Sequence, residues 1–160
     1  MTFNNSKTII SLRIRLFVAT VVFLIYIILT YVTKLIKYPL LGMSDTTWTL
    51  ILIGIYFFIA FLPVFLSYQY VSYSDEGDSI IIRYFFSGIV GGKKNSIEIS
   101  KETFAGYEIE SKLFGLKQSL VLFQRMKEGA AKYPPVHISS LSREEKSKIL
   151  ASLNKFVPRV

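Results

Sequence analysis

The chain has 160 residues, of which 51% are hydrophobic, with a mean hydropathy of +0.43 and a formal net charge of +8. It is too apolar for an ordinary soluble domain, and the absence of cysteine excludes disulfides, thiol nucleophiles, iron–sulfur clusters and cysteine-based zinc sites. Residues 72–160 contain 14 of the 19 basic residues but also 10 of the 11 acids. Such mixing is typical of a solvated surface, so we expect no nucleic-acid partner and favour attraction to anionic lipid headgroups.

The first apolar segment, residues 16–32, reads LFVATVVFLIYIILTYV and carries no charge. At about 1.5 Å per residue it is slightly shorter than a hydrocarbon core of about 30 Å, and flanking Arg and Lys side chains can extend to the headgroups. We expect a membrane-spanning helix over about residues 16–33. Because TKLIKYPLL follows it instead of a small-residue cleavage site, we expect the helix to be retained.

A second apolar segment covers about residues 48–70, with Trp48 at one end and Tyr68 and Tyr70 at the other, as in interfacial aromatic belts. The alternative, a buried helix pair of a soluble protein, would need more surrounding chain than remains. Because the connection between the segments is short, we expect an antiparallel hairpin. Residues 1–71 are thus predicted to form a tail and two spanning helices.

The orientation follows from the basic residues that flank the two segments. The tail before the first segment carries three of them, and the connection carries two, which are Lys34 and Lys37. The positive-inside rule therefore favours a multi-pass protein of the cell inner (plasma) membrane with both termini in the cytoplasm.

The remaining part, residues 72–160, is predicted to form short antiparallel strands followed by one helix. Alternating or β-branched runs indicate six strands, at residues 71–74, 79–86, 96–100, 104–112, 118–126 and 136–139. Ser142 and Glu145 form a capping box that begins a helix over residues 142–157, and Pro158 ends it. The apolar stripe of this helix predicts that it covers an open face or end of the sheet, although a helix lying on the membrane is the alternative.

Three segments resemble bacterial pleckstrin-homology-like (PH-like) domains that are attached to a pair of transmembrane helices. They are SYSDEGDSIIIRY, NSIEISKETFAGYEIES with Phe104 as its apolar anchor, and VHISSLSREEKSKILASLNKF. The likeness covers about residues 70–157, with six predicted strands where a full PH fold has seven. It implies a membrane α-helical hairpin followed by an α+β PH-like domain that serves as a binding or assembly module, with no common set of catalytic residues.

Few side chains suggest chemistry of their own. His137 is the only histidine, and no motif supplies a nucleophile beside it. The acidic turn at residues 75–78 lacks the spacing of a calcium loop, and GIVGGKKN is not a P-loop. We therefore expect no catalytic, cofactor-binding or metal-binding residues and no cofactor. Lys93 and Lys94 are candidates for contact with anionic lipid, the alternative being a solubilising turn.

The sequence thus favours a non-enzymatic integral membrane protein that presents a PH-like binding or assembly module at the cytoplasmic face. Its expected partners are membrane lipids and either another protein or further copies of the chain. The alternative is an accessory or regulatory subunit of a membrane transporter or membrane enzyme complex. Neither apolar segment has an ionisable group in its core, which disfavours a transport pathway through the helices themselves.

Overall fold

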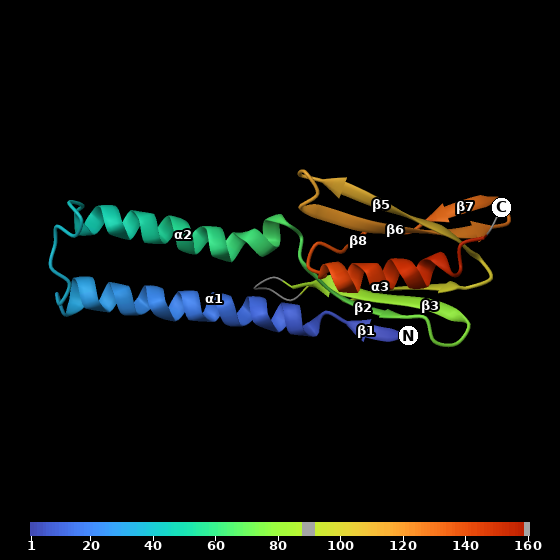
Figure 1. Cartoon of the computed structure of the whole chain (residues 1–160), viewed down its shortest axis with the longest axis horizontal. Helices are drawn as coiled ribbons and strands as arrows, with labels where there is room; N and C mark the ends of the chain where they lie inside the picture. Colours follow the sequence, from blue (N-terminus) through green and yellow to red (C-terminus); the bar gives the residue numbers. More distant parts are fainter. Residues whose placement is uncertain (88–91, 159–160) are drawn as a thin grey trace. The chain divides into compact units, whose positions relative to one another are not determined.

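The structure is a computed structural model and describes residues 1–87 and 92–158 (Figure 1). The chain divides into two compact units. The helical unit is Ile10–Pro63, and the C-terminal unit combines Met1–Ile9 with Val64–Val160. The C-terminal unit thus includes residues 1–9 and 64–71, which were predicted to belong to the tail and the spanning helices.

The helical unit contains most of α1 (Ser6–Ile27), a short π-helix (Ile28–Val32) and most of α2 (Asp45–Phe65). The stretches Ser6–Val32 and Asp45–Phe65 are both long and apolar enough to cross a membrane, each with a hydropathy of 2.3. The second helix ends at Phe65 and not near residue 70 as predicted, since Ser67 adopts a positive φ of 53° and β2 begins at Gln69.

The two helices run antiparallel, as the short connection predicts. Thr20 of α1 shares a hydrogen bond of 3.1 Å with Tyr56, whereas Tyr26, further along α1, shares one of 2.9 Å with Thr49. The order of partners thus reverses along the second helix. Phe23 stacks on Tyr56 between these two hydrogen bonds, with 5.5 Å between ring centroids.

The first sheet of the C-terminal unit is antiparallel, with the strand order β1-β2-β3-β4. Its strands are β1 (Thr2–Asn4), β2 (Gln69–Ser74), β3 (Ser79–Phe86) and β4 (Asn95–Ser100). Three of them match predicted strands. β1 falls in the predicted tail, and three residues are too few to show a period; the strand forms because it pairs with β2 far along the chain.

The second sheet is antiparallel as well, with the order β5-β6-β7 and with β8 also paired to β6. Its strands are β5 (Phe104–Lys112), β6 (Lys117–Met126), β7 (Gly129–Lys132) and β8 (Val136–His137). β7 lies in a predicted loop, because its sequence GAAK has no β-branched or aromatic residue. It is a strand because it continues the hairpin from β6.

Helix α3 (Arg143–Asn154) begins with the predicted capping box. The Ser142 hydroxyl accepts a hydrogen bond from the Glu145 amide at 3.2 Å, and the Glu145 carboxylate accepts one from the Ser142 amide at 2.7 Å. The helix ends at Asn154, earlier than the predicted residue 157, because the Lys155 amide turns back to the Ser152 carbonyl.

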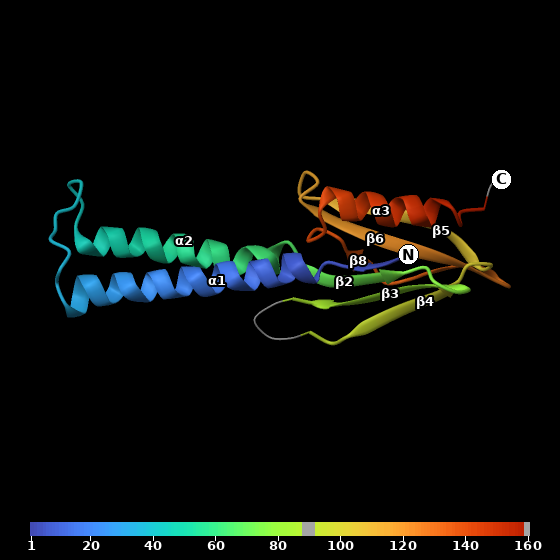
Figure 2. The same cartoon turned by 60° about the horizontal axis from the view of Figure 1, so that its bottom comes forward.

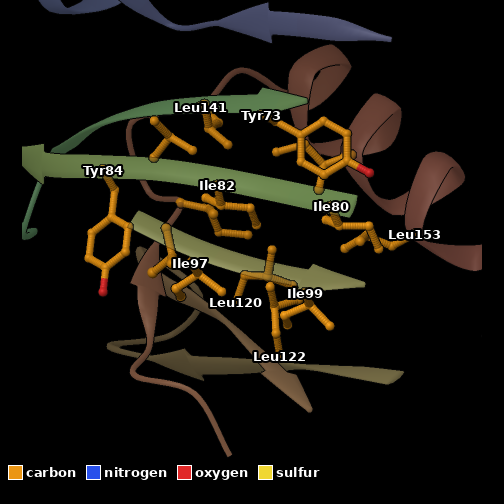
Figure 3. Close-up of a cluster of buried hydrophobic side chains, with 14 of the residues drawn as sticks. Tyr73, Ile80, Ile82, Tyr84, Ile97, Ile99, Leu120, Leu122, Leu141 and Leu153 are labelled. Carbon is orange, nitrogen blue, oxygen red and sulfur yellow. The ribbon is translucent and has the colours of Figure 1, made fainter. Parts of the chain in front are cut away.

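The core of the C-terminal unit lies between the two sheets and α3 (Figure 3). Both sheets contribute, and Ile149 and Leu153 of α3 complete the cluster with 1% and 0% of their surfaces exposed. The helix therefore covers the core, as the apolar stripe predicts, and the antiparallel sheets with one closing helix confirm an α+β layout. The largest of the fully buried side chains include Tyr73, Phe104, Ile80, Ile82, Ile99, Leu120 and Leu122.

Candidate functional site

One end of the C-terminal unit carries both connections to the helical unit, and we call it the junction end. There the chain leaves the unit after Ile9 and returns at Val64. The first residue of β2, Gln69, pairs with Phe86, the last residue of β3. Because antiparallel strands alternate in direction, the connection between β3 and β4, residues 87–94, starts and returns at this same end.

The turn between β5 and β6 lies at the junction end too. The amide of His137 donates a 2.8 Å hydrogen bond to Oε1 of Gln69, and His137 pairs with Ser119 near the start of β6. Figure 1 and Figure 2 both show the β5–β6 turn at the same end of the C-terminal unit as the start of β2. The turns of β2–β3, β4–β5 and β6–β7 consequently lie at the opposite end.

Lys93 and Lys94, the predicted lipid contacts, lie in the β3–β4 connection at the junction end, and both are exposed. The other predicted loop residues 88–91 are outside the described part of the chain. Within residues 1–87 and 92–158, neither lysine takes part in an ion pair. The two ammonium groups are therefore available to an external anion.

The β5–β6 turn, residues 113–116, is apolar and projects from the unit, and we call it the apolar turn. It has the sequence LFGL, and its residues Phe114 and Leu116 are 109% and 65% exposed. The Leu116 amide closes it by donating a 3.1 Å hydrogen bond to the Leu113 carbonyl. Lys112 and Lys117, the residues just before and just after the turn, are opposite each other in the register of β5 and β6. Pattern reasoning treated this segment only as a connection between two strands.

The two loops at the junction end carry a net positive charge. In sequence, residues 87–96 and 111–119 together contain four lysines and no acid. Burial lowers the pKa of His137, and the nearby charges of Lys117 and Lys112 lower it further. Burial also lowers the pKa of Lys146 at the start of α3, with a further contribution from the Arg143 charge. At the start of α3, Glu144 and Glu145 offset the charges of Arg143 and Lys146, so the positive charge of this end comes from the two loops. The β2–β3 turn at the opposite end is acidic.

Buried hydrogen bonds of Asn5 hold the residues just before α1 against the C-terminal unit. Asn5 is fully buried and donates 3.0 Å hydrogen bonds to the Gln69 carbonyl and to the Ser140 hydroxyl. Its side-chain oxygen accepts a 2.9 Å hydrogen bond from the Val71 amide. These contacts join the residues before α1 to the first residues of β2. The geometry of the junction end therefore depends on packing inside the C-terminal unit.

The His137 ring at the junction end is hydrogen-bonded to a serine. Nδ1 of His137 shares a 2.8 Å hydrogen bond with the hydroxyl of Ser119, which is itself buried. No carboxylate is hydrogen-bonded to that ring in the described ranges, so the pair lacks the orienting acid of a catalytic triad. Within the same ranges, no three His, Asp or Glu side chains lie together in a way that could hold a metal ion.

An open groove of about 700 Å³ runs beside α3. Its lining includes Ile109 of β5, Gly115 of the apolar turn, and the α3 residues Arg143, Lys146 and Leu150. The Lys146 ammonium donates a 2.7 Å hydrogen bond to the side-chain oxygen of Gln118, so this cation is partly engaged within the unit.

Comparison of the chain with protein families, with curated proteins and with solved structures finds no match in any of the three.

Proposed function

We propose that the protein is a non-enzymatic integral membrane protein that presents a PH-like binding module at the cytoplasmic face of the inner membrane. The length and hydropathy of Ser6–Val32 and Asp45–Phe65 support two membrane-spanning helices. An antiparallel hairpin returns the chain to the side from which it started. The basic residues Lys7, Arg13 and Arg15 before the first apolar segment favour the cytoplasm as that side.

The layout of the C-terminal unit supports the PH-like part of this proposal. Two antiparallel sheets enclose one core, and a single helix at the end of the chain covers it. The two additional strands, β1 and β7, bring the count above the six that the sequence predicts. A module of this kind acts by binding, and its partner is expected to be lipid, another protein or a second copy of the chain.

The observation that carries the proposal is the position of the exposed lysines. Lys93 and Lys94 lie at the end of the module from which both connections to the apolar helices leave. If those helices span the bilayer, this end is held near the headgroups by the chain itself. Each lysine near an anionic surface contributes about 1 kcal/mol, and salt weakens the attraction.

The test uses the full chain reconstituted in vesicles that are neutral or contain anionic lipid. Because the chain has no cysteine, Ser96→Cys provides a single site for a fluorescent donor, and an acceptor is placed on the lipid headgroups. We expect energy transfer to rise with anionic lipid and to fall with salt. We call a module docked when its junction end lies against the lipid headgroups, where energy transfer is high. Replacing both Lys93 and Lys94 by Glu should lower the ratio of docked to undocked modules more than tenfold at low salt.

A matched control changes two exposed lysines at the opposite end, Lys127→Glu with Lys155→Glu, which alters the net charge by the same amount. This control should leave energy transfer unchanged. Equal transfer in neutral and anionic vesicles, or equal losses in the two double variants, would contradict a specific role for Lys93 and Lys94 and leave a protein partner as the alternative.

A further inference from the structure

The apolar turn has a conformation that its residues do not favour. Phe114 and Gly115 are its two central residues, with φ of 54° and 87°, and Leu113 before them has φ of 53°. Positive φ at both central positions is the pattern of a type I′ turn, in which Asn-Gly or Asp-Gly is usual. A left-handed backbone costs a bulky side chain about 1 kcal/mol. The requirements of the hairpin therefore do not explain Leu and Phe at these positions.

Packing inside the C-terminal unit does not explain them either. Phe114 is 109% exposed, so its ring rests on nothing in the described structure, and Leu113 and Leu116 are 42% and 65% exposed. An isolated exposed apolar residue is common on protein surfaces, but three on one projecting turn form a patch. Such a patch calls for an external apolar environment.

We propose that the apolar turn inserts into the interfacial region of the same bilayer that holds α1 and α2. This inference rests on the proposed function, because it requires those helices to span a membrane. The turn lies at the end of the C-terminal unit from which both connections to the helical unit leave, so a bilayer spanned by the helices would be tethered to that end by the chain. The cost of bringing the turn to that surface is correspondingly small.

The charges around the turn favour a lipid surface over a second copy of the chain. Lys112 and Lys117 pair directly below the apolar residues, and Lys93 and Lys94 lie at the same end of the unit. Apolar side chains surrounded by cations suit a bilayer, where the apolar part enters the boundary region and the ammonium groups meet phosphates. Two copies meeting through this turn would bring the Lys112 and Lys117 side chains of one copy against those of the other.

The experiment measures the depth of position 114 in the full chain, reconstituted in vesicles of phosphatidylcholine and phosphatidylglycerol. Phe114→Cys carries an environment-sensitive fluorophore, and Glu128→Cys, at the exposed turn between β6 and β7, is the control at the opposite end. We expect acyl-chain nitroxide lipids to quench the probe at 114 and not the probe at 128. Aqueous iodide should show the reverse preference.

A second variant tests the turn without a probe on it. Phe114→Asn suits the left-handed backbone, so the hairpin should remain folded and resistant to protease. With the donor at Ser96→Cys, this variant should reduce the docked-to-undocked ratio about tenfold or more, the loss expected when a large apolar side chain no longer leaves water. An undiminished ratio would overturn the inference.

The outcomes separate the inference from the function on which it rests. Iodide quenching at 114 together with anion-dependent docking at Ser96 would overturn insertion of the turn and leave the proposed function in place. Iodide quenching at 114 without docking at Ser96 would overturn both. A probe at 114 that neither quencher reaches would place the turn against protein, and would also overturn insertion into lipid.

Discussion

Replacing Leu153 by Ala tests whether α3 holds the two sheets together. The side chain is 0% exposed and belongs to the core cluster, to which α3 otherwise contributes Ile149 as a fully buried apolar residue. The change removes three carbon atoms, worth about 2.4 kcal/mol of transfer free energy at about 0.8 kcal/mol each. Because a site enclosed on all sides cannot collapse fully, the residual cavity raises the expected loss to about 3–5 kcal/mol.

Such a loss is a large part of the stability of a small domain, which is about 5–15 kcal/mol. The assay is pulse proteolysis in urea on the full chain in mild detergent. A fragment of residues 72–160 is unsuitable, because β1 and the start of β2 would be missing from it. Leu116→Ala, at a position 65% exposed, is the matched control and should change the free energy of unfolding by less than about 0.5 kcal/mol. If Leu153→Ala unfolds at the same urea concentration as this control, α3 does not cover the core.

Three further predictions concern the hydrogen bonds of Asn5, the titration of His137 and the topology of the chain in the membrane. Asn5→Ala leaves the buried Val71 amide without its side-chain partner and should destabilise the C-terminal unit by about 1–3 kcal/mol in the same assay. Because the pKa of His137 is lower in the folded than in the unfolded chain, the unfolded chain binds more protons at acid pH. The free energy of unfolding should therefore fall as the pH drops below about 6.5, and His137→Gln should weaken this dependence; an identical pH profile for the variant would contradict it. In intact cells, an impermeant thiol reagent should label Ser44→Cys and not Ser96→Cys, and the opposite labelling would reverse the proposed orientation.

The sequence predicted those strands and helices whose formation depends on the side chains of the segment itself. The strand of residues 79–86 is rich in β-branched and aromatic side chains, and the capping box at Ser142 begins α3 where expected. β1 and β7 escaped prediction because each depends on its partner: β1 pairs with a strand about 70 residues away, and β7 is held by the hairpin from β6. The end of α2 was placed too late because aromatic residues continue past it, with Tyr68 before β2 and Tyr70 within it.

The candidate site was predicted in part. The composition of the β3–β4 connection pointed to Lys93 and Lys94, but only strand pairing places them at the junction end. The turn at residues 113–116 was predicted only as a connection between two strands, because LFGL differs little in composition from those strands. An apolar segment that contains a glycine and lies between two lysines is a signal for an exposed turn, although the exposure of Phe114 and its positive φ become evident only in the structure.

The most direct test of membrane docking compares the two ends of the C-terminal unit in one set of vesicles. Strand β6 has 10 residues, so its ends lie about 30 Å apart at about 3.3 Å per residue. Fluorescent donors at Ser96→Cys and at Glu128→Cys are therefore well separated, and energy transfer to acceptors on anionic lipid headgroups reports which end faces the bilayer. If the junction end docks on the bilayer, transfer from residue 96 is clearly higher than transfer from residue 128, and salt reduces the difference. Equal transfer from the two positions, or higher transfer from residue 128, would contradict it.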